Sequence, residues 1–570
     1  MMRRTGTVFA AAISLIAAEA WAGTPRTPIE HVIVIVGENR TFDNLFATYQ
    51  PKGGETISNL RSRGIVRADG SPGPNFNLAE QHTAEVTGTF SPTPKQTGVY
   101  ALLPQPYAAD AFGQRQDIPD GRFADPMPNG PFQITQHVTY GAHTGNPVHR
   151  FFQMWQQLDG GKMDLFVWTA ESVGLGPSNT NAYFAHDHTL QGGVAMGFFN
   201  MALGDGPYFR SLAEKYAVAD NYHQSILGGT AVNYFALATA DVGFHTAGGL
   251  PAVPPTSLIE NPDPQPGTNN WYTEDGFRGG TYVACADQAA PGVAPIRAYL
   301  ASLPYAVFKD GNCEPGHYYM VNNLDPGYRP DGTVQGTHSE NLLLTPQTIP
   351  NVGDLLSAGG VSWKWYAGGR NDGKLTDREY CGMCDTLTFF RSTMTGPDRA
   401  RLQDLQQFYV DVKDAANFPA VSVIAPYDSI SGHPGYAIEP AFDELARDIV
   451  ARVQANPELW RHTVVLVTFD EGGGYYDSGY VQPLDFFGDG TRVPLIAVSP
   501  YARPGHVDHT YYDHASIIKF IEYNWGLPRL SARSRDNLPN PVHDKRDAYV
   551  PQNRPAIGDL TGLFDFKRKP

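Results

Sequence analysis

Residues 30–36 read EHVIVIV and are followed directly by GEN at residues 37–39. A short, nearly continuous apolar run rich in β-branched residues is typical of a strand buried on both faces of a parallel sheet. The same composition recurs further along the chain, as VSVI at 421–424, TVVLVTF at 463–469 and VPLIAV at 493–498. We therefore expect several buried parallel strands with polar loops at their carboxyl ends.

Helical segments alternate with these strands. Residues 442–456 and 514–525 have the apolar spacing of amphipathic helices. This alternation predicts an α/β fold, a doubly wound and mostly parallel sheet with helices on both faces. Residues 51–147 and 243–360 are instead rich in Pro, Gly, Asn and Asp. We interpret them as loop-rich cap insertions in a single domain that spans residues 23–570.

The composition is that of a globular, acidic protein. Hydrophobic residues make up 41% of the 570 and charged residues 18%, which is enough apolar material for a large core. The 42 basic and 58 acidic side chains give a formal net charge of −16, which repels a phosphate backbone at long range. We therefore expect no nucleic-acid partner, whereas a small phosphate ester can bind where a local cation supplies positive charge.

The N-terminus has the pattern of a signal peptide. Arg3 and Arg4 precede an apolar run at residues 8–18 and small residues around a cleavage point after Ala22. We expect residues 1–22 to be removed and the protein to be periplasmic or secreted, through either the twin-arginine or the general secretory route. No later run is long and apolar enough for a transmembrane anchor.

Four cysteines in an exported chain favour disulfides. Pairing Cys285 with Cys313 and Cys381 with Cys384 is the most local of the three possible arrangements. Zinc binding by Cys381 and Cys384 is the alternative, but the chain lacks a second Cys pair at metal-ligand spacing.

Polar side chains follow two of the predicted strands. Glu38 and Asn39 come directly after the first strand, and Asp470 and Glu471 come directly after the strand at 463–469. Since parallel strands end at the same edge of a sheet, these four side chains can converge. Oxygen donors of this kind suit a divalent cation. The competing interpretation of each pair is an ordinary polar loop.

A glycine pair, Gly228 and Gly229, precedes Thr230 at a predicted helix start. Free backbone amides and the helix dipole favour an anionic phosphoryl group there, and glycine allows close approach of the backbone. Thr230 is therefore a candidate nucleophile, with a plain helix N-cap as its alternative role.

Several motifs occur in one order and together resemble a known family. They are GENRTFD at 37–43, GKMDLF at 161–166, DNY at 220–222 leading to Thr230, DEGGGYYD at 470–477, and RVP at 492–494 with YDHASI at 512–517. The chain resembles the bacterial phosphoesterase family of phosphocholine-preferring phospholipases C and AcpA-type acid phosphatases, within the alkaline-phosphatase-like superfamily. The resemblance runs from about His31 to about Leu527.

The resemblance implies one divalent metal ion of unknown identity. Its ligands would be Glu38, Asn39, Asp470, Glu471 and the nucleophile Thr230. Coordination would lower the pKa of the hydroxyl and favour attack on phosphorus, and water would then cleave the phosphothreonine.

The resemblance also implies histidines around the phosphate, where an imidazole can donate to phosphate oxygens or protonate the leaving group. His149 and His433 match family positions, and His317 is a third candidate where the family often has two adjacent histidines. Ser478 stands where the family commonly has a histidine. His514 matches a downstream motif, but we expect it to pack against or cap the helix that follows.

Three functions remain open. Phospholipases C of this family usually carry further carboxyl-terminal β domains, whereas this chain ends soon after residues 514–525, which favours an acid phosphatase or general phosphoesterase. A phospholipase C that cleaves phosphocholine esters of lipids is the first alternative, since the aromatic loops at 271–272 and 363–366 can cage a choline ammonium. A non-catalytic secreted metal-binding protein is the second. The oligomeric state is left open.

Overall fold

The computed structural model describes residues 23–568 except residue 86 and segments 110–114, 124–126, 173–190, 264–279, 336–342, 371–378 and 544–545. The predicted signal peptide and the aromatic pair at 271–272 lie outside the described residues. Among the helices that are described, none has the length and apolar character needed to cross a bilayer.

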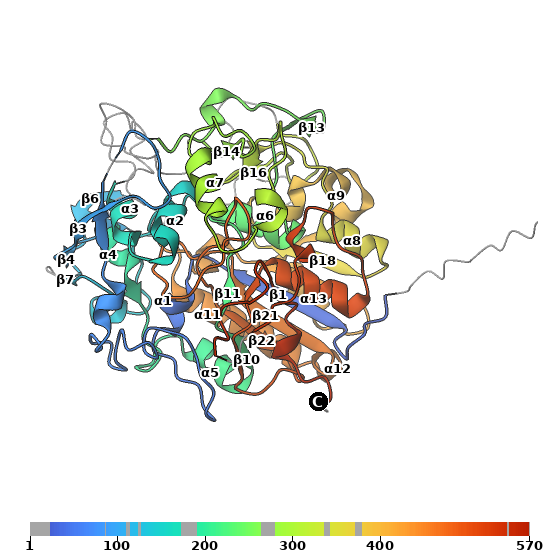
Figure 1. The fold of residues 1–570 in the computed structure, drawn as a ribbon. Helices are drawn as coiled ribbons and strands as arrows, with labels where there is room; N and C mark the ends of the chain where they lie inside the picture. The colour runs from blue at the N-terminus through green and yellow to red at the C-terminus, as the bar shows by residue number, and fades with distance from the viewer. Residues whose placement is uncertain are drawn as a thin grey trace, which may run out of the picture.

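An eight-stranded sheet forms the centre of the molecule (Figure 1). Each pair of neighbouring strands is parallel, except the two pairs made by β22, which are antiparallel. The predicted mostly parallel α/β sheet is thus confirmed. In spatial order the strands are β19 (Leu402–Asp404), β18 (Trp363–Ala367), β20 (Val421–Ala425), β1 (His31–Gly37), β21 (Thr463–Phe469), β22 (Leu495–Val498), β10 (Ala217–Ala219) and β23 (Val507–Asp508).

Helices cover both faces of this sheet. Gly37, at the end of β1, faces α11 (Glu439–Gln454), because a Cβ added to it would lie 2.4 Å from the ring of Phe442. Val32 of β1 points to the face opposite Gly37, and Trp363 lies in register with Val32 because both are paired with Val421. On that face the Trp363 indole N–H donates to Ser357 of α8 (Val352–Ala358). Helices α5 (Pro207–Lys215) and α11 pack together, and α6 (Thr230–Thr239) packs between α8 and α13 (Ala515–Trp525).

The predicted insertions contain short elements. The first holds two-residue to five-residue strands, β2 (His82–Ala84) to β8 (Phe132–Gln133), beside α2 (Phe151–Leu158) and α3 (Phe166–Ser172) (Figure 1). The second holds α7 (Val293–Ala301) and the small strands β12 (Thr246–Ala247) to β17 (Leu343–Leu344), above α6 in the same view. The last residues of the predicted second insertion form α8, which packs on β18 of the central sheet.

One sequence interpretation was wrong. We expected residues 363–366 to be an aromatic loop that can cage choline, but they form strand β18 of the central sheet. Trp363, Trp365 and Tyr366 are buried in the core, and the indole N–H of Trp365 donates to the carbonyl oxygen of Cys384 at 3.2 Å. Aromatic residues have high strand propensity and pack well on a pleated surface, which explains the difference.

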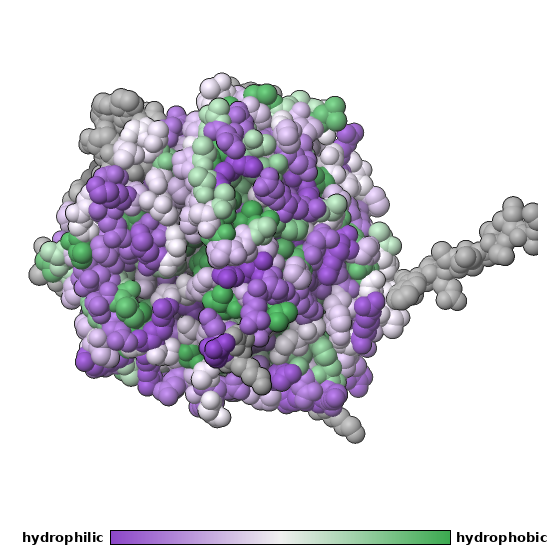
Figure 2. Space-filling model, viewed as in Figure 1, coloured by the Kyte–Doolittle hydropathy of each residue, from purple (hydrophilic) through white to green (hydrophobic). Residues whose placement is uncertain are grey.

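The predicted disulfides are confirmed, because Cys285 pairs with Cys313 and Cys381 with Cys384. On the outside, hydrophilic side chains cover most of the face seen in Figure 2, and hydrophobic ones form small separate groups. The exposed large hydrophobic residues are scattered along the chain, from Leu78 to Val542. The outer face therefore agrees with the acidic composition.

Candidate metal and phosphate site

The carboxyl edge of the central sheet brings the predicted polar loops together. Gly37 of β1 is in register with Phe469 of β21, so Glu38 and Asp470 leave adjacent parallel strands at the same level. The backbone N–H of Asn39 donates to Asp470 Oδ1 at 3.1 Å. Asn39 adopts a left-handed conformation with φ of 62°, which asparagine tolerates better than most residues.

Glycine lets the second loop approach the first. A Cβ on Gly473 would lie 2.7 Å from the Cβ of Asn39, and the φ of Gly473 is 61°. The carboxylate of Glu471 turns back on its own loop, because Oε2 accepts from the N–H of Gly473 at 2.6 Å. Within the GGG run, Gly473 is therefore required by the close contact of the two loops, whereas a Cβ on Gly474 would meet the carbonyl oxygen of Val148.

The side chains of Glu38, Asn39, Asp470 and Glu471, here called the carboxylate cluster, are buried and incompletely paired. Asn39 Oδ1, Asp470 Oδ2 and Glu471 Oε1 have no well-formed hydrogen bond to any described residue. Burial raises the pKa of Asp470 to about 7. Burial, followed by repulsion from Asp470, raises the pKa values of Glu38 and Glu471 well above their ordinary range.

These residues fit a hard divalent cation. Their oxygen atoms are the donors that such an ion prefers, and the buried atoms without partners are available to it. Among the described side chains, the ligand atoms of Glu38, Asp470 and Glu471 do not all come within 4.8 Å of one another. Ionised carboxylates this close repel one another, and a bound cation would offset that repulsion.

Thr230 is the first residue of α6, and Gly229 is the N-cap without any side-chain cap hydrogen bond. The alternative role of Thr230 as the N-cap is therefore wrong. The Thr230 hydroxyl instead interacts with the carboxylate of Asp470 and lowers its pKa against the larger effect of burial. A Cβ on Gly228 would meet the carbonyl oxygen of Val321 at 2.6 Å, so the glycine pair is needed for the packing around this helix start.

Two of the three predicted histidines lie at the carboxylate cluster. The Nδ1 of His433 donates to the carbonyl oxygen of Pro434 at 2.6 Å, and its Nε2 accepts from the side-chain amide of Asn39 at 3.0 Å. His149 holds the carbonyl oxygen of Pro147 through Nδ1 at 2.8 Å and has Nε2 3.6 Å from Glu471 Oε1. The two imidazole rings are 6.4 Å apart, centroid to centroid.

The third histidine is not brought to the cluster. His317 stacks on Tyr319, packs against Phe244 and lies 3.5 Å from Glu314 Oε2, and no contact described for it reaches the carboxylate cluster. His514 has a role that the sequence did not indicate. Its Nε2 contacts the backbone carbonyl oxygen of Asp470 at 2.5 Å, so it supports the loop and provides no cap to α13.

Sequence reasoning missed three neighbours of the site. Asn323 accepts from the N–H of Ala231 at 2.9 Å, directly after Thr230. The ring of Tyr436 stacks on His433, and its hydroxyl donates to Glu38 Oε2 at 3.2 Å. Cys384 Sγ lies 3.6 Å from Glu38 Oε1. Tyr436 was detectable as the aromatic residue in the SGHPGY segment, and Asn323 as part of an Asn pair that follows a short apolar run.

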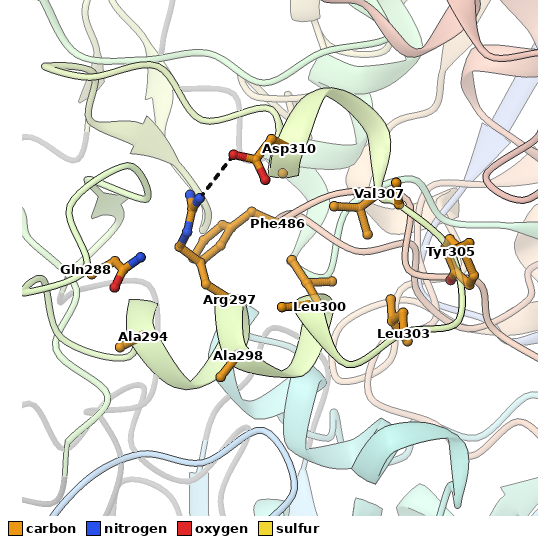
Figure 3. Close-up of a pocket in the computed structure, with 13 residues that line it drawn as sticks. Gln288, Ala294, Arg297, Ala298, Leu300, Leu303, Tyr305, Val307, Asp310 and Phe486 are labelled. Carbon is orange, nitrogen blue, oxygen red and sulfur yellow. Dashed lines mark ion pairs between the residues drawn. The ribbon is translucent and has the colours of Figure 1, made fainter.

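A pocket of about 640 Å³ lies elsewhere, along α7 and the loop that follows it (Figure 3). Leu300, Leu303 and Val307 line it, and Arg297 pairs with Asp310 at 3.5 Å. Phe486 also lines it, and its ring stacks on Phe151 at the start of α2. The lining residues include no member of the carboxylate cluster.

Known proteins similar to this chain include two phospholipases C. A hemolytic phospholipase C from Pseudomonas aeruginosa is 26% identical over 417 residues, which cover 65% of this chain and 43% of that protein. Phospholipase C B from Mycobacterium tuberculosis is 23% identical, with 95% of this chain and 79% of that protein covered. The chain thus spans less than half the length of the Pseudomonas relative.

Other similarities extend this set. A probable acid phosphatase from Kluyveromyces lactis is 26% identical over 233 residues, which cover 39% of this chain and 52% of that protein. A solved alkaline-phosphatase-superfamily protein from Vibrio parahaemolyticus aligns with a TM-score of 0.26 and 10% identity over 58% of this chain and 63% of its own. The family model named Phosphoesterase matches residues 29–528, a span that holds every candidate site residue. This chain therefore belongs to the Phosphoesterase family.

Proposed function

We propose that the protein is an exported, metal-dependent phosphoric-ester hydrolase, an acid phosphatase or general phosphoesterase, with Thr230 as nucleophile. The observation that carries this proposal is the position of Thr230. Its hydroxyl, at the start of α6, interacts with Asp470 inside a cluster of buried oxygen donors. Relatives named phospholipase C and probable acid phosphatase support the same reaction class.

Glu38, Asn39, Asp470, Glu471 and Thr230 would hold one divalent cation. When bound, the ion would lower the pKa of the Thr230 hydroxyl and neutralise negative charge on the transferred phosphoryl group. The N–H groups of the first turn of α6 add partial positive charge for the same phosphoryl oxygens. Burial of the cluster keeps water out and strengthens each of these interactions.

The reaction then has two steps. Oγ1 of Thr230 attacks phosphorus, the ester oxygen leaves with a proton, and a phosphothreonine remains. Water next attacks that phosphorus, which releases phosphate and restores the hydroxyl. His149 and His433, whose Nε2 atoms face the carboxylate cluster, would in their protonated forms donate to phosphoryl oxygens or deliver the proton to the leaving oxygen.

The test compares p-nitrophenyl phosphate with p-nitrophenyl phosphocholine after chelation and readdition of single divalent metals. We expect turnover of the monoester by the wild type and its loss in Thr230→Ala. Thr239→Ala is the matched control, because this buried threonine lies at the other end of α6 and bonds the carbonyl oxygens of Phe235 and Asp241.

Each other outcome selects an alternative. Preference for the phosphocholine diester would place the protein with the phospholipases C. Metal binding without turnover of either ester would support a non-catalytic secreted metal-binding protein. Equal turnover by Thr230→Ala and the wild type would remove Thr230 as the nucleophile.

A further inference from the structure

The Cys381–Cys384 disulfide lies against one of the candidate metal ligands. Cys384 is fully buried, with Sγ 3.6 Å from Glu38 Oε1. The loop is fixed from two sides, since the Cys384 carbonyl accepts from the Trp365 indole and its N–H donates to Cys381 Sγ at 3.2 Å. The two sulfur atoms are therefore held beside a carboxylate that leaves the end of β1.

The ligand atoms of Cys381, Cys384 and Glu38 lie as close together as the ligands of one metal ion. The two sulfur atoms and one carboxylate oxygen of Glu38 all lie within 4.8 Å of one another, the one such group of three among the described His, Cys, Asp and Glu residues. Ligands of a tetrahedral zinc ion, at roughly 2.3 Å for sulfur and 2.1 Å for oxygen, lie about 3.6 to 3.8 Å from each other. The two sulfur atoms are bonded in the disulfide, so after reduction they would have to move apart to about 3.8 Å to bind one ion together with Glu38.

We propose that reduction of Cys381–Cys384 creates a second metal site, made of Cys381, Cys384 and Glu38, for a thiophilic divalent cation such as Zn²⁺ or Cd²⁺. An external dithiol transfers two electrons and two protons to the Cys381–Cys384 bond. This bond breaks to give two cysteine thiols, and the reductant is oxidised to its own disulfide. The cation then displaces the two thiol protons and binds two thiolates and one carboxylate. Solvent completes the tetrahedron.

This site shares Glu38 with the carboxylate cluster. Oε2 of Glu38 is held by the Tyr436 hydroxyl, and Oε1 is the atom that faces Cys384. A thiophilic ion on the reduced side would therefore withdraw Glu38 from the cluster. The oxidised disulfide prevents this, because its sulfur atoms have no thiolate to offer.

The second disulfide provides an internal comparison. Cys285 and Cys313 are 28 residues apart, and Cys285 lies in the hydrophobic core. The sulfur of Cys313 is 3.3 Å from the carbonyl oxygen of Gly311. Among the described residues, no carboxylate gathers with this pair as Glu38 does with the other.

The experiment titrates Cd²⁺ into the full-length protein before and after reduction by a phosphine, which is removed by anaerobic gel filtration before the metal is added. Alkylation and mass spectrometry show which cysteines are free, and far-UV circular dichroism shows that the fold is kept. We expect one equivalent of Cd²⁺ with a thiolate-to-metal absorption band in the reduced protein, and no band in the oxidised protein. A folded protein with free Cys381 and Cys384 but no stoichiometric band would overturn the proposal.

Two carboxylate variants test the third ligand. Glu38→Gln should weaken Cd²⁺ binding to the reduced protein by about tenfold or more. Substituting a residue that only hydrogen-bonds to a metal ligand already lowers metal affinity by about tenfold, and a direct ligand should matter at least as much. Glu458→Gln, at an exposed carboxylate paired with Arg461 outside both sites, is the control and should leave the thiolate band and the affinity unchanged. Equal affinity in wild type and Glu38→Gln would show that Glu38 is not a ligand. The Cys381→Ser/Cys384→Ser variant should lose the band, and alkylated wild type serves if that variant does not fold.

The absorption readout does not depend on hydrolysis, whereas loss of turnover in the reduced, Cd²⁺-loaded protein rests on the proposed function. If the reduced protein shows the thiolate band but the oxidised protein hydrolyses neither ester, the hydrolase proposal alone is rejected. Normal turnover without a band would reject this site alone.

Discussion

Two groups of buried charges lie side by side in the DEGGGYYD segment and behave in opposite ways. In the carboxylate cluster, Asp470 and Glu471 have oxygen atoms without partners and raised pKa values. Seven residues after Asp470, Asp477 forms a bidentate pair with Arg492, both contacts being 2.9 Å. Burial pushes the pKa of Asp477 upward, but Arg492 more than offsets it, so the pKa lies below its ordinary value.

The acidic residues of the DEGGGYYD segment therefore serve two purposes: Asp470 and Glu471 are candidate metal ligands, and Asp477 pairs with Arg492. Arg492 also lies 3.2 Å from Asp43 and donates to the carbonyl oxygens of Ser58 and Asp220, so each nitrogen of its guanidinium has a partner within the protein. We call Asp43, Asp477 and Arg492 the Arg492 cluster. The Asp477–Arg492 pair is satisfied within the protein and holds the loops together, whereas the oxygen atoms of Asp470 and Glu471 that lack partners are available to a ligand. The predictions below test that division.

The largest effect is expected from Asp470→Asn. Loss of this charge should reduce kcat/KM for p-nitrophenyl phosphate by about a thousandfold or more, because cation binding and charge stabilisation are both weakened. The metal-free protein should be as stable as the wild type or more stable at pH 8, since a buried charge without a cationic partner is removed. Steady-state kinetics and urea unfolding measure the two properties. If Asp470→Asn greatly lowers the free energy of unfolding of the metal-free protein, Asp470 stabilises the fold in the same way as Asp477.

Asp477→Asn is the matched change in the Arg492 cluster and should act on stability. It leaves the Arg492 guanidinium buried with fewer anionic partners, which costs about 3 kcal/mol or more. Metal affinity, measured by calorimetry well below the unfolding temperature, should stay within about threefold of the wild type. A variant of full stability that no longer binds metal would reverse the assignment of the two clusters.

The pH dependence of stability tests the carboxylate cluster through Asp470. The pKa of Asp470 is about 7 in the folded protein and near 3.9 when unfolded, so the metal-free fold holds an extra proton between these values and loses stability as the pH rises through them. A divalent cation replaces that proton. We therefore expect the increase in Tm on adding metal to grow from pH 5 to pH 8, and Asp470→Asn to flatten the trend. A metal-induced increase that shrinks with pH would contradict this cause.

The sequence predicted the parts of the molecule where local pattern and structure agree. Strands β1, β20 and β21 lie within one residue of their predicted positions, because each is an apolar run buried on both faces. Helix α11 starts at Glu439, before the predicted residue 442, since Pro440 suits a first helical turn. Strand β18 was missed because its Trp and Tyr residues fit a loop-rich cap equally well when packing is unknown.

The candidate site was predictable only in part, for a similar reason. Residues directly after strands, such as Glu38 and Asp470, are placed by sheet topology, which a sequence reveals. Side chains from the insertions are placed by loop packing, which it does not reveal. His317 was chosen by family resemblance, and the position beside Thr230 is instead held by Asn323.

The smallest effects are expected from this last pair. Asn323→Ala should lower kcat/KM about fivefold, because it removes one hydrogen bond of about 1 kcal/mol to the turn that presents Thr230. His317→Gln should change kcat/KM by less than about twofold, since the contacts of His317 are with Glu314, Phe244 and Tyr319. Both are measured against p-nitrophenyl phosphate at saturating metal. A larger loss in His317→Gln than in Asn323→Ala would mean that the second insertion moves toward the phosphate during turnover, and the histidine suggested by family resemblance would regain its role.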